Sequence, residues 1–162
     1  MYFATEDSAR DYLEQIRWPE GTVCPHCGAK DGRKLNPRPE SPTHARKGLH
    51  QCGGCRRQFS VTVGTLFEDA HTPLHKWLKA IYLMCASGKG VSAAQLKRDL
   101  DLGSYRTAWS MRHRIRWALQ KGPNPVGLPW DRVVESLLKV RPEARDRIRG
   151  ERIIGAKMER RH

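Results

Sequence analysis

Two cysteine pairs constrain the fold of this chain more than any other feature of its sequence. The segments "VCPHCG" at 23–28 and "QCGGCRRQFS" at 51–60 each hold two cysteines separated by two residues. A pair at this spacing forms a tight knuckle that directs two thiolates at one metal ion, and two knuckles supply the four ligands of a tetrahedral zinc site. The spacing predicts one structural Zn2+ with the ligands Cys24, Cys27, Cys52 and Cys55.

Other uses of paired cysteines fit the sequence less well than zinc. A thioredoxin-like redox site needs one C-x-x-C within a strand–helix unit, whereas this chain has two pairs and no such frame around them. An iron–sulfur cluster uses the same four ligands, so the spacing alone leaves that alternative open. His26 lies between the first two ligands and is interpreted as solvent-facing, because four thiolates complete the shell. Cys85 is interpreted as a buried thiol on an apolar helix face.

The region around the cysteines has too few apolar residues to fold unaided. Residues 22–71 are rich in Gly and Pro, and only "QFSVTVGTLF" at 58–67 is typical of a strand. A segment of this size and composition needs a staple such as a metal ion. Before it, a helix is predicted over 5–17, capped by Thr5 and ended by "WPEG" at 18–21.

Three further helices are predicted between residues 72 and 121. Thr72 and Pro73 favour the start of the first, and "SGKG" at 87–90 ends it. Ser92 caps the second, "DLGS" breaks it, and the third runs from after Ser104 to about Gln120. Helices joined by such a tight turn have the outline of a helix-turn-helix, whose last helix lies in the major groove of DNA.

The charge of the chain is strongly positive and unevenly distributed. Thirty Lys and Arg face 17 Asp and Glu, which gives a formal net charge of +13. Residues 72–121 carry ten basic residues and only two acidic ones, Asp99 and Asp101. Such an excess favours a polyanionic partner, above all double-stranded DNA, although a basic surface without a partner is the alternative.

The third predicted helix has an outward face suited to DNA. At about 100° per residue, Arg106, Ser110 and His113 lie opposite the apolar positions Ala108 and Met111. Base contacts usually come from the N-terminal half of a recognition helix, and phosphate contacts from basic residues around it. The candidate DNA-binding residues are Ser104, Tyr105, Arg106, Thr107, Ser110, His113, Arg114 and Arg116, with Arg56 and Arg57 of the second knuckle.

No apolar run approaches the roughly 20 residues that a membrane span needs. The N-terminus lacks the apolar core of a signal peptide, so a cytoplasmic protein with reduced thiols is expected. The fold class expected is small α+β. Its four parts are an N-terminal helix (1–21), a four-cysteine zinc ribbon (22–71), a three-helix helix-turn-helix unit (72–121), and an amphipathic helix with a basic tail (122–162).

Three segments closely resemble the N-terminal region of a bacterial insertion-sequence transposase family. They are "CPHCG", "CRRQFSVTVGTLFEDAHTPLHKWLKAIYLM" and "LGSYRTAWSMRHRIR", and the resemblance spans roughly residues 10–120. Proteins of that family carry a zinc ribbon, a helix-turn-helix and then a nuclease domain with three metal-binding carboxylates. The resemblance implies that the four cysteines bind zinc and that 73–120 recognises the terminal repeats of the element. It also implies association with the bacterial nucleoid.

The sequence departs from this family in two places. Asp101 stands where the family usually has Gly in the turn before the third helix; Asp tolerates a left-handed backbone better than most residues, so the turn is expected to survive. The 41 residues 122–162 are far fewer than a nuclease domain needs. One helix and a charged tail cannot hold two metals in a buried site, so the carboxylates there are interpreted as surface charges. They are Asp131, Glu135 and Asp146.

These observations favour a sequence-specific DNA-binding protein derived from a transposase and non-catalytic by itself. An intact transposase or a second copy of the chain is a further candidate partner. Two alternatives stay open at this point. The chain could be the DNA-binding fragment of an active transposase, or a zinc-ribbon module that binds other proteins. A stable protein complex formed without DNA would support the last of these.

Overall fold

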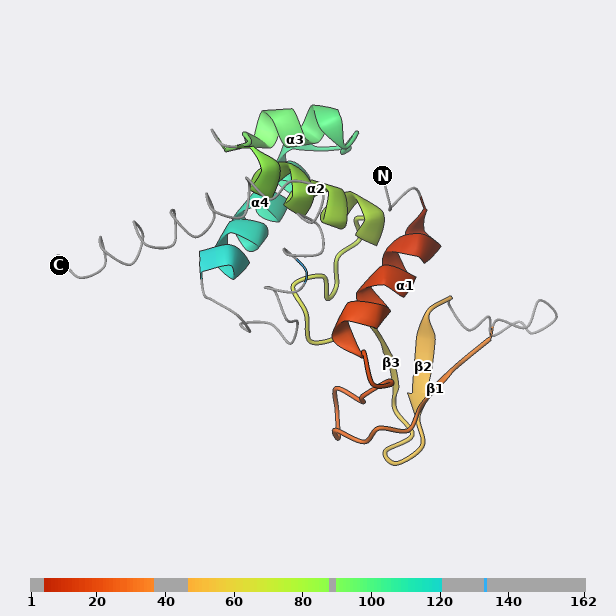
Figure 1. Cartoon of the computed structure of the whole chain (residues 1–162). Helices are drawn as coiled ribbons and strands as arrows, with labels where there is room; N and C mark the ends of the chain where they lie inside the picture. The colour runs from red at the N-terminus through yellow and green to blue at the C-terminus, as the bar shows by residue number, and fades with distance from the viewer. Residues whose placement is uncertain (1–4, 37–46, 88–89, 121–132, 134–162) are drawn as a thin grey trace, which may run out of the picture. The chain divides into compact units, whose positions relative to one another are not determined.

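The computed structural model describes residues 5–36, 47–87, 90–120 and 133. The chain divides into two compact units, Met1–His75 and Lys76–His162 (Figure 1). In the described residues, four helices and one three-stranded sheet form a small α+β fold. The helix and basic tail predicted after residue 121, with Asp131, Glu135 and Asp146, lie outside the described residues, apart from the buried Val133.

Helix α1, Glu6–Arg17, begins at the predicted cap. The hydroxyl oxygen of Thr5 accepts the backbone N–H of Ser8 at 3.2 Å, and the hydroxyl of Ser8 accepts the backbone N–H of Thr5 at 3.2 Å. This reciprocal pair satisfies two backbone donors that the first helical turn leaves free. Ala9 and Leu13 lie on the buried face, and the helix ends before Trp18, as predicted.

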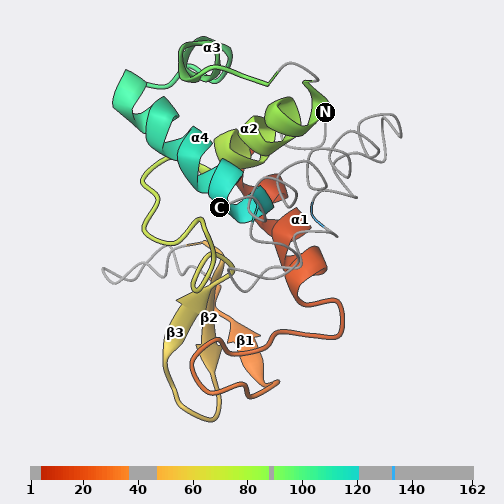
Figure 2. The same cartoon turned by 90° about the vertical axis from the view of Figure 1, so that its left-hand side faces the viewer.

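The sheet of the first unit has three short antiparallel strands in the order β1-β2-β3, shown side by side in Figure 2. Its strands are β1 (Gly32–Lys34), β2 (Leu49–Cys52) and β3 (Gln58–Ser60). Strands β1 and β2 had no clear signal in the sequence. The strands are only three or four residues long, so their register depends on what is attached to them, namely the first knuckle before β1 and the second knuckle between β2 and β3.

The two faces of this sheet differ in burial because neighbouring side chains alternate along each strand. His50 and Phe59 face each other across β2 and β3 and are buried. In the next cross-strand row, Arg33, Gln51 and Gln58 are all exposed. The sheet therefore has one face toward the core of the unit and one toward solvent.

An aromatic cluster forms the core between α1 and the sheet. The ring of Trp18 meets His50 edge-on at a centroid distance of 5.3 Å and Phe59 at 5.8 Å, while His50 stacks on Phe59 at 5.7 Å. Close by, Nη1 of Arg17 donates to the carbonyl of Val61 at 2.6 Å. These contacts hold the end of α1 on the buried face of the sheet.

The strand predicted over 58–67 is wrong beyond residue 60. Consecutive turns follow β3, in which the backbone N–H of Val63 bonds to the carbonyl of Ser60, and that of Thr65 to Thr62. The hydroxyl of Thr65 donates to the carbonyl of Thr62 at 2.6 Å and accepts the N–H of Phe67 at 3.1 Å. Such hydroxyl bonds to nearby backbone compete with a strand ladder, which explains the failure of the prediction.

The start of α2 also differs from the sequence expectation. The helix spans Leu74–Ala86, so it begins after Pro73 rather than at it. Glu6, and not Thr72, satisfies its first donors: the carboxylate accepts the N–H of Leu74 at 3.0 Å and that of His75 at 3.2 Å. A cap provided by a residue 68 positions away leaves no local pattern in the sequence.

Helices α3 (Ala93–Asp99) and α4 (Tyr105–Gln120) of the second unit pack against each other. Ser92 caps α3 by accepting the N–H of Gln95, as predicted. In the turn that follows, Asp101 adopts a left-handed backbone with φ 48°, and its carbonyl accepts a hydrogen bond from Nζ of Lys76 at 2.8 Å.

Replacing Asp101 tests the strain in this turn. Asp101→Gly should raise the free energy of unfolding by about 0.5–1 kcal/mol, because Gly adopts positive φ without a steric penalty. Asp101→Ala should lower it, because Ala tolerates a left-handed backbone less well than Asp does. Urea unfolding followed by helical circular dichroism measures both variants. Equal effects of Gly and Ala would contradict the assignment of strain.

The stability of the first unit should fall in mildly acidic solution because of His50. Burial lowers the pKa of this ring below its usual value, although Glu14 and a hydrogen bond with the backbone of Gly48 act in the opposite direction. The unfolded chain then binds a proton near pH 6.5 that the folded chain excludes, so stability is lost as the pH falls through about 6.5. An NMR titration with zinc in excess should find His50 protonating below pH 6.5; protonation at or above that value would contradict the burial argument.

Candidate metal centre and nucleic-acid interface

The four predicted cysteine ligands meet at one point in the first unit. Their sulfur atoms all lie within 4.8 Å of one another. Cys24 and Cys55 approach to 3.7 Å between sulfurs, and Cys27 and Cys52 to 3.5 Å. Four sulfurs at about 2.3 Å from one zinc ion are spaced by nearly 3.8 Å in a tetrahedron, so the donor set fits zinc. Separations this long exclude disulfide bonds, and all four cysteines are free.

Backbone N–H groups of the knuckles donate hydrogen bonds to two of these sulfurs, which favours their thiolate form. The N–H of His26 points at Sγ of Cys24 (3.4 Å), and the N–H of Cys55 at Sγ of Cys52 (3.4 Å). Burial raises the pKa of Cys24, but the backbone N–H groups of His26 and Cys27 and the thiols of Cys27 and Cys55 together outweigh it and lower the pKa to about 7. A sulfur that ionises near neutral pH is ready to bind metal.

The pKa of Cys52 is shifted in the opposite direction. The N–H of Cys55 lowers this pKa, but burial and the neighbouring thiols of Cys27 and Cys24 raise it above its ordinary value. One thiol of the cluster therefore holds its proton more tightly than another. Metal binding displaces that proton, so zinc affinity should depend on pH.

A structural role follows from the ligand number. Four thiolates complete the tetrahedral shell and leave no position for a catalytic water. In the part of the chain that the structure describes, no second group of His, Cys, Asp and Glu side chains is arranged to hold a metal. His26 is exposed, and Cys85 is buried on α2 and is not part of the cluster, as the sequence indicated.

Helix α4 in the second unit carries most of the predicted DNA-binding residues. Ala108, Met111 and Ile115 form its buried face. The exposed candidates are Ser104, Tyr105, Arg106, Ser110, His113 and Arg116. Large aromatic rings share this outward side, since Tyr105 is 54% exposed, Trp109 49% and Trp117 48%. The helix therefore presents both basic and aromatic groups to solvent.

Some of the predicted DNA-binding residues are already engaged within the unit. The hydroxyl of Ser104 accepts the N–H of Thr107 at 3.0 Å and lies 2.9 Å from its hydroxyl, so these two side chains form the cap of α4. The guanidinium of Arg114 lies 5.3 Å from the ring centre of Trp77. Arg106, Ser110, His113 and Arg116 are better placed to contact a ligand.

The second knuckle brings together basic residues that the sequence had only partly indicated. Arg56 and Arg57, two of the predicted DNA-binding residues, are exposed on the loop after Cys55. Arg33 and Gln51 lie on the same side of the sheet as Arg56, and sequence reasoning missed both. The register between β1 and β2 sets this arrangement, and neither strand had a pattern from which it could be inferred.

Comparison with known proteins agrees with the geometry of the cluster. Residues 4–58 match the family described as transposase zinc-ribbon domain. The chain is also 31% identical over 123 residues to a Halobacterium salinarum protein described as an uncharacterized protein in transposable element ISH50. That match covers 76% of this chain and 38% of the relative, so the chain spans well under half of the relative's length. No solved structure matches the chain.

The four cysteines thus form the structural zinc site of a zinc ribbon, as the sequence predicted. No helix within the described ranges is long and apolar enough to cross a membrane.

Removing one ligand tests the metal centre. Cys52→Ser should lose zinc and unfold the first unit, because metal binding supplies much of the folding free energy of such a small domain. Cys85→Ser is the matched control, since Cys85 lies outside the cluster and its loss should leave zinc content unchanged. Metal analysis and melting curves measure both. Full zinc occupancy in Cys52→Ser with an unchanged melting curve would exclude the predicted role.

Proposed function

Because the chain belongs to a transposase-related family with an N-terminal zinc ribbon, we propose that it binds double-stranded DNA sequence-specifically and does not cleave DNA by itself. The zinc ribbon of such a family already favours a role with nucleic acid. The observation that carries the finer proposal is the outward face of α4, where Arg106, Ser110, His113 and Arg116 are exposed.

The order of elements supports a helix-turn-helix. Helix α3 is followed by a turn of a few residues and then by the longer α4, and the two helices pack together. In a helix-turn-helix, the second of two such helices enters the major groove with its N-terminal residues toward the bases. Arg106 lies in the first turn of α4 and is exposed, so it is the first candidate for reading a base.

The charge of this segment supports a polyanion as partner. Residues 72–121 hold ten basic and two acidic residues, and the described part carries Arg106 and Arg116 on the outward face of α4. Arginine makes two parallel hydrogen bonds to guanine in the major groove, or to a phosphate of the backbone. We expect Arg106 to do the first and Arg116 the second. Association with the nucleoid would follow from such binding.

Two other functions have some support. The same residues could be the DNA-binding part of a longer enzyme, since the Halobacterium relative is much longer than the match. A protein-interaction role is favoured by the aromatic side chains on α4. Tyr105, Trp109, His113 and Trp117 recur every four residues, and the rings of Trp109 and His113 lie 4.0 Å apart. Exposed tryptophans are enriched in protein interfaces.

The roles of Arg106 and Arg116 can be separated by their dependence on sequence and salt. Arg106→Ala should cost about 1–3 kcal/mol on the preferred duplex and relax the sequence preference, since it removes a base contact. Arg116→Ala should weaken all duplexes alike and flatten the log–log salt slope by about one unit, since it removes a phosphate contact. Fluorescence anisotropy on specific and scrambled duplexes at several salt concentrations measures both.

Equal loss on both duplexes for Arg106→Ala would show that this residue does not read bases. If neither variant changed binding, the helix-turn-helix assignment would fail. A complex with another protein that forms without DNA, and that Trp109→Ala abolishes, would favour the interaction module instead.

A further inference from the structure

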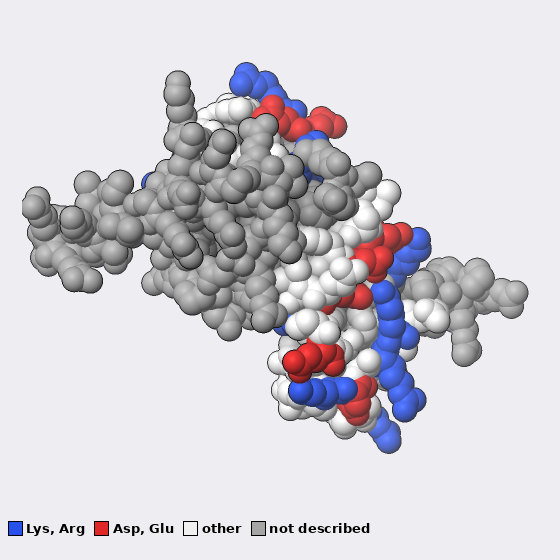
Figure 3. Space-filling view, viewed as in Figure 1, with Lys and Arg blue, Asp and Glu red and all other residues white. Residues whose placement is uncertain are grey.

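Four of the eight Lys and Arg residues that the structure describes in the first unit are paired with carboxylates. Lys34 lies 3.2 Å from Glu14 and 3.4 Å from Asp11, and Lys47 lies 3.0 Å from Asp7. In the space-filling view, basic and acidic side chains of this unit lie beside each other (Figure 3). Solvent-exposed pairs of this kind leave little net field for a partner.

Arg33 and Arg56 differ from these residues. Both are exposed, and neither forms an ion pair with any residue that the structure describes. Together with Gln51, Cys52 and Gly53 they line a hollow of about 300 Å³ on the solvent side of the sheet. Two guanidinium groups without an ion-pair partner beside one hollow indicate a site for an anion, although Sγ of Cys52 and the nearby carboxylate of Asp31 add negative charge at one edge of the hollow.

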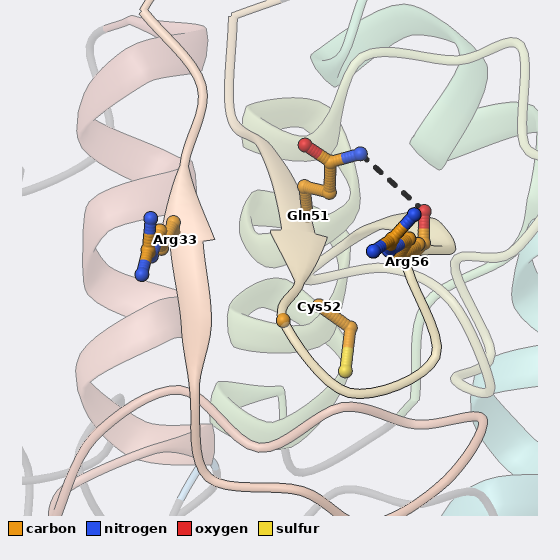
Figure 4. A pocket seen from close by; sticks show the side chains of 5 residues that line it. Arg33, Gln51, Cys52 and Arg56 are labelled. Carbon is orange, nitrogen blue, oxygen red and sulfur yellow. Dashed lines mark hydrogen bonds between the residues drawn. The ribbon is translucent and has the colours of Figure 1, made fainter.

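The side chains around the hollow come from three parts of the ribbon (Figure 4). Arg33 on β1 is the direct cross-strand partner of Gln51 on β2, so their side chains share one face of the sheet. Nε2 of Gln51 donates to the carbonyl of Arg56 at 3.4 Å, which links the loop to the sheet. The hollow is therefore built on strands and a metal-bound knuckle.

The backbone of Arg56 is a second observation, independent of its charge. The two knuckles are alike in that the residue after the second cysteine has a left-handed backbone: Gly28 with φ 77° and Arg56 with φ 58°. Gly takes this conformation freely, whereas most other residues, Arg among them, are strained in it. The first knuckle thus uses the unstrained residue and the second does not. A strained backbone at a position where Gly would be unstrained is typical of functional sites.

We propose that Arg33, Gln51 and Arg56 form a binding site for a phosphodiester group of the DNA backbone. This inference rests on the proposed function, because it assigns the zinc ribbon a phosphate contact in the same DNA complex. The planar fork of arginine matches the oxygens of a phosphate, and the amide of Gln51 adds a further donor. A backbone contact contributes affinity without sequence preference.

The zinc centre is the alternative explanation for the two arginines. Four thiolates around one zinc ion carry a net negative charge, and the carboxylate of Asp31 lies 3.5 Å from Sγ of Cys52. Arginines nearby could offset that charge. Within the described residues, however, the sulfurs receive hydrogen bonds from backbone N–H groups and other thiols, and none from a guanidinium.

The test uses the zinc-loaded full chain with Arg33→Ala, Arg56→Gly and Arg56→Ala. Lys30→Ala is the matched control, since Lys30 is exposed and faces Glu20 at 3.9 Å. Short labelled duplexes of unrelated sequence are titrated at several salt concentrations, and zinc content and melting temperature are measured for each variant. Inorganic phosphate at constant ionic strength is a second probe, which separates a backbone phosphate from the free ion.

Each arginine variant should weaken every duplex by on the order of tenfold at low salt and flatten the log–log salt slope by about 0.9 per lost contact. Lys30→Ala should leave the slope unchanged. Zinc content should be that of the wild type, and Arg56→Gly should melt higher than Arg56→Ala while binding DNA as weakly. Inorganic phosphate should leave the melting temperature of the wild type unchanged.

Wild-type affinity and slope in all three arginine variants, with DNA bound by the wild type, would overturn this inference and leave the proposed function intact. Loss of zinc in Arg33→Ala together with loss of affinity would assign the arginines to the metal centre and also overturn it. Stabilisation by inorganic phosphate that Arg33→Ala removes, with an unchanged salt slope on duplexes, would make the site one for the free ion. A wild-type chain that binds no duplex would overturn both proposals.

Discussion

The coordination of one zinc ion by four thiolates is the interaction on which the first unit depends. The sheet has strands of three or four residues, too short to be stable as an isolated ladder. Cys52 ends β2, and Cys55 lies in the loop to β3, so the metal holds this hairpin to the first knuckle. Only with the sheet in place do His50 and Phe59 form a surface against which Trp18 can pack. The apolar core is thus a consequence of the metal site.

The sequence was sufficient to predict a feature where nearby residues or the ligand chemistry of the side chains determine it. Cysteine spacing gave the ligands, and the caps Thr5 and Ser92 gave the starts of two helices. Sequence patterns failed where the cause is distant. Glu6 caps α2 from far along the chain, and the hydroxyls of Thr62 and Thr65 turn a strand-like sequence into consecutive turns. Arg33 and Gln51, which are proposed to bind a phosphate, lie side by side because of the register between β1 and β2. No pattern in the sequence of either strand revealed that register.

Of the three described residues other than Gly that have a left-handed backbone, Arg56, Asp69 and Asp101, two can be compared with a Gly. Asp101 takes this conformation in the turn before α4, where the resemblance leads one to expect Gly. Arg56 takes it at the end of the second knuckle, where the first knuckle has Gly28. Asp is moderately suited to this region and Arg is not, so the two positions differ in what they imply. A tolerated substitution explains Asp101, whereas the strained backbone at Arg56 supports the proposed phosphate contact of its guanidinium.

Selection of duplexes from a random-sequence pool by the zinc-loaded chain shows whether α4 reads the sequence of DNA. A protein that reads bases through α4 should enrich one motif over successive rounds, and the enriched duplex should bind far more tightly than its scrambled version. Retention of DNA without any enriched motif would show that the chain binds only the backbone. No retention of DNA at low salt would contradict the account altogether.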